Sequence, residues 1–175
     1  MTAALVGPYL GSVALLGLAG LTKLARPDDT AGALAAARLP ARPALVRAGA
    51  AAEVAVAVAA CVAPGPIPPA LVALSYLGFV AFVGLALNHG WPIASCGCFG
   101  RPDTRPTPTH LIIDSAAALI AMGWVLTGTT RVSEAFDHQP WNGVPLGLAA
   151  AVTTGLAYLL LTNPLDQLRA GRMTG

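Results

Sequence analysis

Long uncharged stretches constrain the fold of this 175-residue chain more than any other feature of its sequence. A helix needs about 20 residues to cross the ~30 Å hydrocarbon core of a bilayer. Five apolar stretches come close to that length: residues 2–21, 44–63, 69–87, 111–129 and 144–162. With 55% hydrophobic residues, 10% charged residues and a mean hydropathy of +0.68, the chain has the composition of a membrane protein.

Helices are the structure expected in these five stretches. The hydrocarbon core holds no water, so each backbone N–H there must bond within the protein, and a single apolar segment achieves this as a helix. Proline-rich turns such as residues 64–69 separate the stretches, because proline lacks the N–H that a helix needs. The sequence therefore predicts an all-α integral membrane bundle with five transmembrane helices. The first is expected to be retained, since no Lys or Arg precedes it and its apolar part is longer than that of a signal peptide.

The distribution of Lys and Arg predicts how the chain sits in the membrane, because positively charged loops stay in the cytoplasm. With the N-terminus outside and the C-terminal tail in the cytoplasm, only Arg131 of the 10 basic residues lies outside. This orientation places Cys96 and Cys98 at the cytoplasmic face. Residues 24–43 are too polar to span and are expected as a short helix on the inner surface or as a solvated loop. The composition indicates a lipid bilayer as partner, and no basic surface interleaved with aromatic residues suggests nucleic acid.

Two cysteines stand close together in the sequence IASCGCFGRP, residues 93–102, with one glycine between them. Glycine permits the sharp turn that a disulfide between Cys96 and Cys98 requires, and the small ring would be strained and easily reduced. A loop this short removes little entropy from the unfolded chain, so a purely structural bridge is the least favoured interpretation. Redox exchange is favoured. Trp91 and Phe99 would then line a site for an apolar carrier, or anchor the loop at the interface.

Two alternatives for the cysteine pair remain open. His89 and His110 bracket Cys96 and Cys98 and complete a Cys₂His₂ set, which is a permissible ligand set for zinc, although paired zinc cysteines are usually two to four residues apart. A metal-binding or small-solute transport module is therefore the main rival, and inert thiols in a structural membrane subunit are the third reading. No Gly-rich phosphate-binding motif or Ser-His-Asp set is evident, which disfavours nucleotide-dependent and hydrolytic enzymes.

Three charged residues fall within the apolar stretches, where an ionisable group is costly unless it is paired or protonated. Glu53 lies about ten residues into the second stretch, Asp114 is near the start of the fourth, and Lys23 ends the first. If all three face inward, they meet in the inner half of the bundle near the cysteine loop. There a carboxyl group would take up protons released by dithiol oxidation, and a cation would favour the reactive thiolate. Ordinary roles at helix ends explain Lys23 and Asp114 equally well.

At these residues the chain resembles the MauE/DoxX group of small membrane proteins. The matching features are LLGLAGLTKLARP at residues 15–27, Glu53 in the second span and SCGCFG at residues 95–100. The last string points to the MauE branch, which is associated with methylamine utilisation. Residues 1–130 are thus expected to form a four-helix MauE/DoxX-like core, and residues 131–175 an extra transmembrane helix with a cytoplasmic tail.

The resemblance implies a membrane component of thiol-disulfide oxidoreduction. The composition, rich in Ala, Gly and Pro and with one lysine among 10 basic residues, indicates a bacterial source. The resemblance also implies a role in forming disulfides in methylamine dehydrogenase with a thioredoxin-like partner, and the DoxX branch adds a quinone as a candidate cofactor. Cys96 and Cys98 would be the exchanging pair, with Lys23 and Glu53 as the polar interior. That role requires oxidation outside the cell, whereas the charge count places the cysteines inside. Three explanations stay open: a cytoplasmic partner, a loop reached from the outer face, or a misleading charge count.

Overall fold

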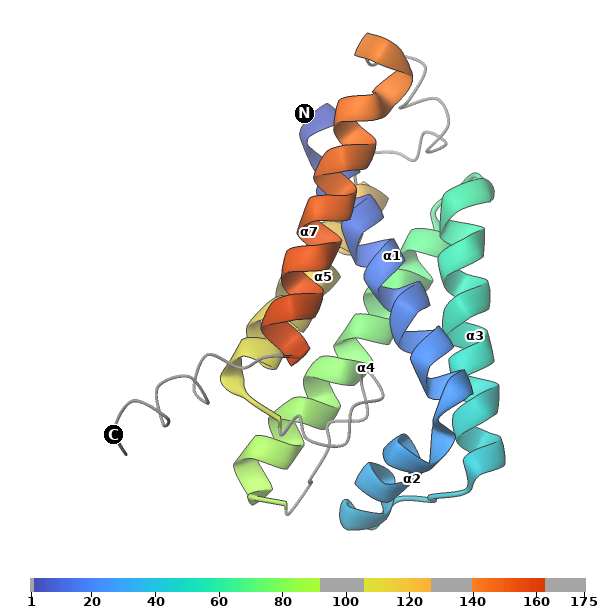
Figure 1. Cartoon of the computed structure of the whole chain (residues 1–175), viewed down its shortest axis with the longest axis vertical. Helices are drawn as coiled ribbons and strands as arrows, with labels where there is room; N and C mark the ends of the chain where they lie inside the picture. The colour runs from blue at the N-terminus through green and yellow to red at the C-terminus, as the bar shows by residue number, and fades with distance from the viewer. Residues whose placement is uncertain (1, 92–105, 127–139, 163–175) are drawn as a thin grey trace.

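The computed structural model describes residues 2–91, 106–126 and 140–162 of the chain (Figure 1). Within these residues the secondary structure is helical and contains no strand, which confirms the predicted all-α class. The elements are α1 (Thr2–Ala25), α2 (Pro27–Ala36), α3 (Pro43–Val62), α4 (Ile67–His89), α5 (Pro108–Leu126), a 3-10 turn η1 (Pro140–Gly143) and α7 (Val144–Thr162).

The helices match the predicted spans to within a few residues at each end. Within the described ranges, the helices α1, α3, α4 and α5 are long and apolar enough to cross a membrane. The fifth predicted span is α7, whose strongly apolar part, Gly147–Leu160, is shorter; that it crosses the membrane stays a prediction. The polar connection after the first span contains the short helix α2, which decides between the two structures expected there.

Helix α1 is the central element of the bundle (Figure 1). It packs against α3 on one side and against α5 and α7 on the other, while α4 packs along α5. More than half of its span is buried inside the protein (56%), compared with 22% to 33% for α3, α4 and α5. Contact between α3 and α4 is sparse by comparison, although these helices follow one another in the chain.

Aromatic side chains hold α1 to its neighbours in the core. The rings of Tyr9 on α1 and Trp124 on α5 are stacked with centroids 4.8 Å apart. The buried hydroxyl of Tyr76 on α4 donates a hydrogen bond of 2.7 Å to the backbone oxygen of Ser12 on α1. Such a partner stabilises a buried polar group in a membrane bundle, since lipid supplies none.

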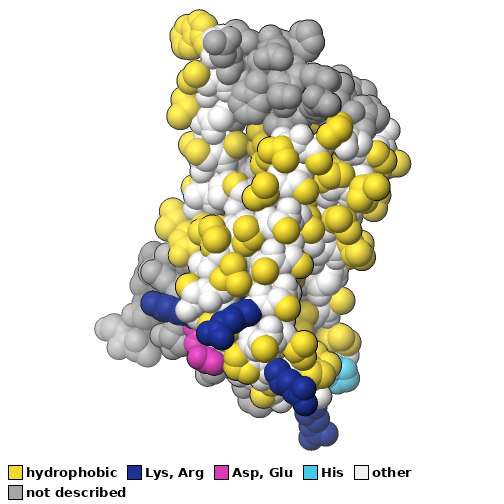
Figure 2. Space-filling view, turned by 90° about the vertical axis from the view of Figure 1, so that its right-hand side faces the viewer, with side chains coloured by type: hydrophobic (Ala, Val, Ile, Leu, Met, Phe, Trp, Pro, Cys, Tyr) yellow, Lys and Arg dark blue, Asp and Glu magenta, His cyan; other side chains and the backbone are white. Residues whose placement is uncertain are grey.

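The outer surface is largely apolar, with its charges gathered at one end. Figure 2 shows hydrophobic side chains over most of one face and Lys, Arg and acidic side chains near its lower end. Large apolar side chains such as Leu74, Leu119 and Leu126 are more than 60% exposed. In lipid such side chains need no burial in protein, because the bilayer core is as apolar as they are. The surface is thus that of a bundle surrounded by hydrocarbon.

Candidate functional site

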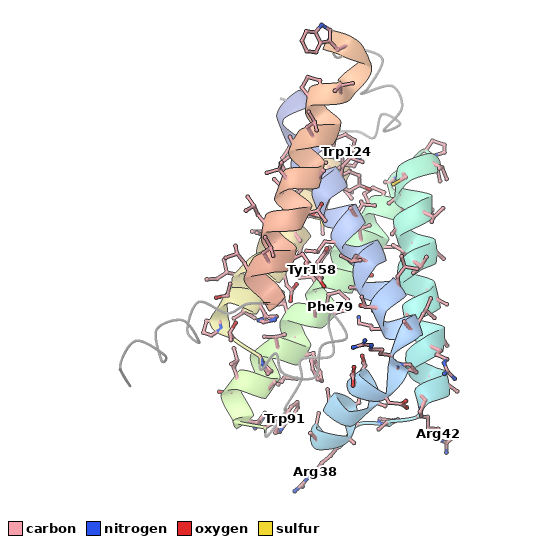
Figure 3. The ribbon with its side chains drawn as sticks, viewed as in Figure 1. Arg38, Arg42, Phe79, Trp91, Trp124 and Tyr158 are labelled. Atoms are coloured by element: carbon pink, nitrogen blue, oxygen red, sulfur yellow. The ribbon has the colours of Figure 1, made fainter. Side chains whose placement is uncertain are left out.

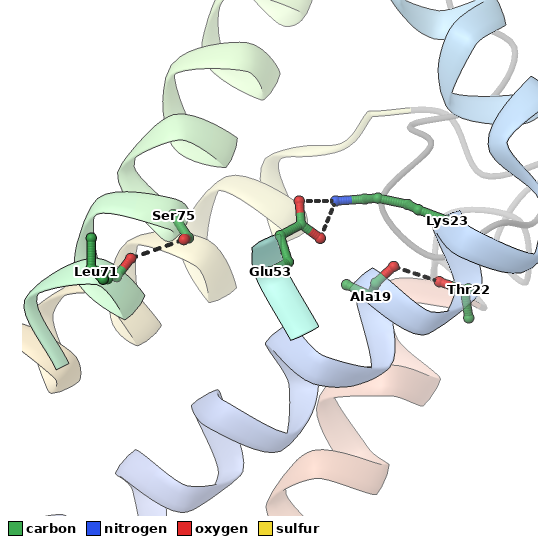
Figure 4. Close-up of polar contacts among 6 residues, drawn as sticks. All are labelled: Ala19, Thr22, Lys23, Glu53, Leu71 and Ser75. Atoms are coloured by element: carbon green, nitrogen blue, oxygen red, sulfur yellow. Dashed lines mark hydrogen bonds and ion pairs between the residues drawn. The ribbon is translucent and has the colours of Figure 1, made fainter. Parts of the chain in front are cut away.

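A buried ion pair joins α1 to α3 in the interior of the bundle (Figure 4). The Nζ atom of Lys23, in the last turn of α1, lies 2.7 and 2.9 Å from the two carboxylate oxygens of Glu53. The side chains are only 7% and 16% exposed. Glu53 stands ten residues beyond the start of α3, about 15 Å along the helix axis. A charge at such a depth is stable only with its partner, and here each has one.

A glycine one turn before Lys23 allows this contact. A Cβ atom on Gly20 would lie 2.8 Å from Cγ2 of Val54, 2.9 Å from the backbone oxygen of Ala50 and 3.2 Å from Cβ of Glu53. Any larger residue would therefore collide with α3. The hydrogen at this position lets the two backbones approach closely enough for the lysine to reach the glutamate.

Helix α4 adds an aromatic face to the ion pair. The Nζ atom of Lys23 lies 4.4 Å from the centroid of the Phe79 ring, close enough for a cation–π attraction. Phe79 packs edge-on against Tyr76, one turn earlier on the same helix, with centroids 5.8 Å apart. Figure 3 shows Phe79 on α4 in the middle of the bundle, beside α1. Three helices therefore meet around one ion pair.

The start of α5 brings two more polar side chains into the interior. His110 and Asp114 lie four residues apart on this helix and are 1% and 6% exposed. The hydroxyl of Thr107 lies 2.8 Å from Nδ1 of His110. Asp114 is close enough to Lys23 and to Tyr76 to interact electrostatically with both. Asp114 thus lies within electrostatic range of Lys23, and we call Lys23, Glu53 and Asp114 together the polar cluster.

The segment that carries the cysteine pair is attached at this same end of the bundle. Helix α4 ends at His89, and Gly90 turns the chain with a positive φ of 57°, a conformation that glycine adopts without strain. The next residue, Trp91, stacks on His89 with ring centroids 5.5 Å apart and an interplanar angle of 11°. It also lies beside Phe82, at 6.4 Å. Figure 3 shows Trp91 at the end of α4, near α2.

The cysteine pair itself lies outside the described residues. Cys96, Cys98 and Phe99 fall between Trp91 and Pro106, where the structure resumes. Their predicted roles therefore stay predictions. Among residues 2–91, 106–126 and 140–162 no group of three or more His, Cys, Asp or Glu side chains is placed to hold a metal ion. This does not test the four-ligand alternative, because two of its ligands are the cysteines.

Sequence reasoning identified the charged members of the cluster and missed the residues that hold them. Lys23, Glu53 and Asp114 stood out because charges are rare in apolar spans. The aromatic pair Tyr76 and Phe79 was missed, although its three-residue spacing places both rings on one face of a helix. That spacing in an otherwise aliphatic span was the available signal.

In the described part of the chain, four helices are long and apolar enough to cross a membrane, and three of them meet at a buried Lys–Glu pair. These features define the class: a small multi-pass integral membrane protein built as a helical bundle. A family model described as methylamine utilisation protein MauE matches residues 1–128. The chain belongs to this family, and the resemblance to MauE is thereby confirmed. The match covers α1 to α5 and stops before α7. No curated protein and no solved structure matches the chain.

Proposed function

We propose that this MauE-family protein is a membrane thiol–disulfide redox protein in which Cys96 and Cys98 cycle between dithiol and disulfide. The observation that carries the proposal is where the cysteine segment is attached. Its two ends are the end of α4 and the start of α5, at the end of the bundle that also holds the buried cluster of Lys23, Glu53 and Asp114. Redox-active thiols adjoining buried ionisable groups have a route for the protons that their oxidation releases.

The exchange proceeds through a mixed disulfide with a thioredoxin-like partner. A thiolate of the reduced partner attacks the Cys96–Cys98 disulfide, and one of the two sulfurs leaves as a thiolate. The partner's second thiolate then attacks the mixed disulfide, so the partner leaves oxidised and the cysteine pair is left as a dithiol. Two electrons have moved from the partner to this protein. The oxidised partner can then form disulfides in a client of methylamine utilisation.

Return to the disulfide requires an acceptor of two electrons and two protons. A membrane quinone fits this demand, since its reduction to the quinol consumes both the electrons and the protons that the dithiol releases. In this scheme Asp114 passes protons near the start of α5. Lys23 is already paired with Glu53, so we assign it to holding that carboxylate in the membrane interior rather than to activating a thiol.

Trapping the mixed disulfide tests the proposal. Cys61 on α3, the third cysteine of the chain, is exposed and is first changed to Ser so that it forms no adduct. In this background Cys96→Ser and Cys98→Ser are made separately, and membranes are run on non-reducing gels with mass spectrometry of any adduct. One of the two variants is expected to accumulate a reducible adduct with a thioredoxin-like protein. Its remaining thiolate attacks the oxidised partner in the reverse of the proposed exchange, and the second cysteine of the pair, which would release the partner in its reduced form, is missing. The variant that lacks both cysteines is the control and should trap nothing. Absence of an adduct in both single variants, with protection of the thiols by metal alone, would support the metal-binding alternative.

A further inference from the structure

An apolar cleft of about 470 Å³ lies between α3 and α4, with residues of α2 at one end. Its volume is in the range of sites that hold small molecules. The cleft exists because α3 and α4 diverge and because glycines face it. A Cβ atom on Gly49 of α3 or on Gly78 of α4 would meet no atom within 4 Å. Leu45, Leu71 and Leu74 at the cleft are all exposed, so it faces the lipid.

The Lys23–Glu53 pair forms the charged part of the wall of this cleft, to which Thr30 and Ser75 add hydroxyl groups. Lys23 and Glu53 are the charged side chains among its described lining residues, and their charges cancel at 2.7 and 2.9 Å. A charged ligand would lose its hydration without gaining a net counter-charge. A neutral ligand is therefore favoured.

The pair still has hydrogen-bonding capacity to offer. A carboxylate accepts about four hydrogen bonds and an ammonium donates three, whereas two are made between Lys23 and Glu53. Hydrocarbon cannot satisfy the remainder. An oxygen-bearing head group satisfies it, and the rings of Phe79 and Phe82 offer that head an apolar surface.

We propose that the cleft binds an uncharged, membrane-soluble molecule whose head carries carbonyl or hydroxyl oxygens and whose apolar tail lies between α3 and α4. The head contacts Lys23 and Glu53, and the molecule enters sideways from the lipid. From Val46 to Val56 the cleft follows α3 for about 15 Å, long enough for both head and tail. This chemistry is shared by membrane quinones and neutral acylglycerols. The binding does not depend on the cysteines, so it stands apart from the proposed thiol exchange.

Saturation binding to the full chain in lipid nanodiscs tests the inference. Three radiolabelled probes are compared: a decyl-substituted benzoquinone, monodecanoylglycerol and decane, which lacks a head. Empty nanodiscs give the background. At least one headed probe is expected to bind saturably and at least about tenfold more tightly than decane, a difference that one or two hydrogen bonds to a charged group supply. Preference for the quinone or for the glycerol ester identifies the source of the ligand. Equal binding of all three probes would overturn the inference.

Filling the cleft provides the matched comparison. Gly78→Leu and, from the opposite wall, Gly49→Leu are each expected to lower the affinity for the probe that carries a head group by at least about tenfold. Gly147→Leu on α7, where a Cβ likewise meets nothing within 4 Å, should leave binding unchanged. Circular dichroism and gel filtration show which variants fold. Two cleft variants are made so that one can be measured if the other does not fold. Tight binding to both folded cleft variants would overturn the inference. The Cys96→Ser/Cys98→Ser chain should bind as the native protein does, so that failure of the thiol mechanism is distinguishable from failure of the cleft.

Discussion

Lys23 and Glu53 are stable inside the bundle only as a pair, because removal of either leaves an uncompensated charge in a medium that cannot hydrate it. The pair is nearly enclosed, with Phe79 against the ammonium group and Gly20 allowing α3 close to α1. Its stability therefore depends on residues that carry no charge. This dependence makes separate tests possible for the charges and for the packing.

Replacing one residue of the Lys23–Glu53 pair should lower the free energy of unfolding more than replacing both. Lys23→Met and Glu53→Leu are each expected to lower the free energy of unfolding by about 3–5 kcal/mol, the loss typical of a buried ion pair that is missing one partner. The double variant should lose less than either single variant, since no charge is left unpaired. Equilibrium unfolding in mixed micelles measures all three. Losses that simply add in the double variant would show that the two residues do not depend on each other.

The close approach at Gly20 gives a second prediction. Gly20→Ala should lower the free energy of unfolding by about 1–3 kcal/mol, because the new methyl group collides with α3. Gly49→Ala is the control within a helix of the same bundle, where the methyl group meets nothing and alanine's better helix propensity should leave stability equal or up to ~1 kcal/mol higher. The same unfolding assay compares them. Equal effects at both positions would contradict the close packing of α1 and α3.

The charged residues of the cluster could be predicted from the sequence, whereas the uncharged residues that pack around them could not. Glu53 stood out from the cost of a charge about ten residues into an apolar span. Its partner was harder to assign, since a lysine at a helix end also reaches the interface by itself. Phe79 and Gly20 depend on how α1, α3 and α4 are rotated and how closely they pack. Sequence periodicity does not determine these quantities in spans that are apolar on nearly every face.

At the scale of helices, lengths and ends were predictable and packing partners were not. Uncharged length and proline placed the spans within a few residues of α1, α3, α4 and α5. No feature of the sequence predicts that α3 and α4 diverge, because in a membrane protein the lipid-facing and the helix-facing surfaces are both apolar. The cleft between them was therefore found only in the structure.

Removing α7 tests whether the first four spans form an independent core. Helix α7 packs on α1, where a Cβ on Gly11 would lie 2.8 Å from Oγ1 of Thr153, and Oγ1 of Thr154 donates a 3.3 Å hydrogen bond to the Gly11 oxygen. The Lys23–Glu53 pair involves no residue of α7. A chain ending at residue 130 is expected to keep its helical circular dichroism in micelles and to respond to Lys23→Met as the full chain does. Loss of folded protein on truncation would show that α7 belongs to the core.

Over the whole molecule, the charges favour one orientation in the membrane. All the Lys and Arg residues in the described part of the chain lie from Lys23 to Arg47, at the end of the bundle formed by α2 and the start of α3 (Figure 3). Positive charge at one end predicts that this end is cytoplasmic. The cysteine segment is attached at the same end, whereas the α3–α4 turn is at the other.

Labelling with a membrane-impermeant maleimide on intact cells tests this orientation. In a Cys61→Ser background, Ala63→Cys marks the α3–α4 turn, and this variant lacks Cys96 and Cys98. The marker is expected to react on intact cells, and Cys96 in a Cys98→Ser chain only after the cells are permeabilised. The reverse pattern would place the cysteine segment outside and remove the conflict with disulfide formation beyond the membrane.

The most direct measurement of the central claim counts free thiols on the purified Cys61→Ser chain in proteoliposomes. The protein is oxidised, then reduced, then oxidised again, and alkylated at each stage before mass spectrometry. Reversible redox chemistry predicts two alkyl groups after reduction and none after either oxidation, with Cys96 and Cys98 joined in one peptide. Two alkylated cysteines at every stage, or thiols that only a metal ion protects, would contradict thiol–disulfide exchange as the function of this protein.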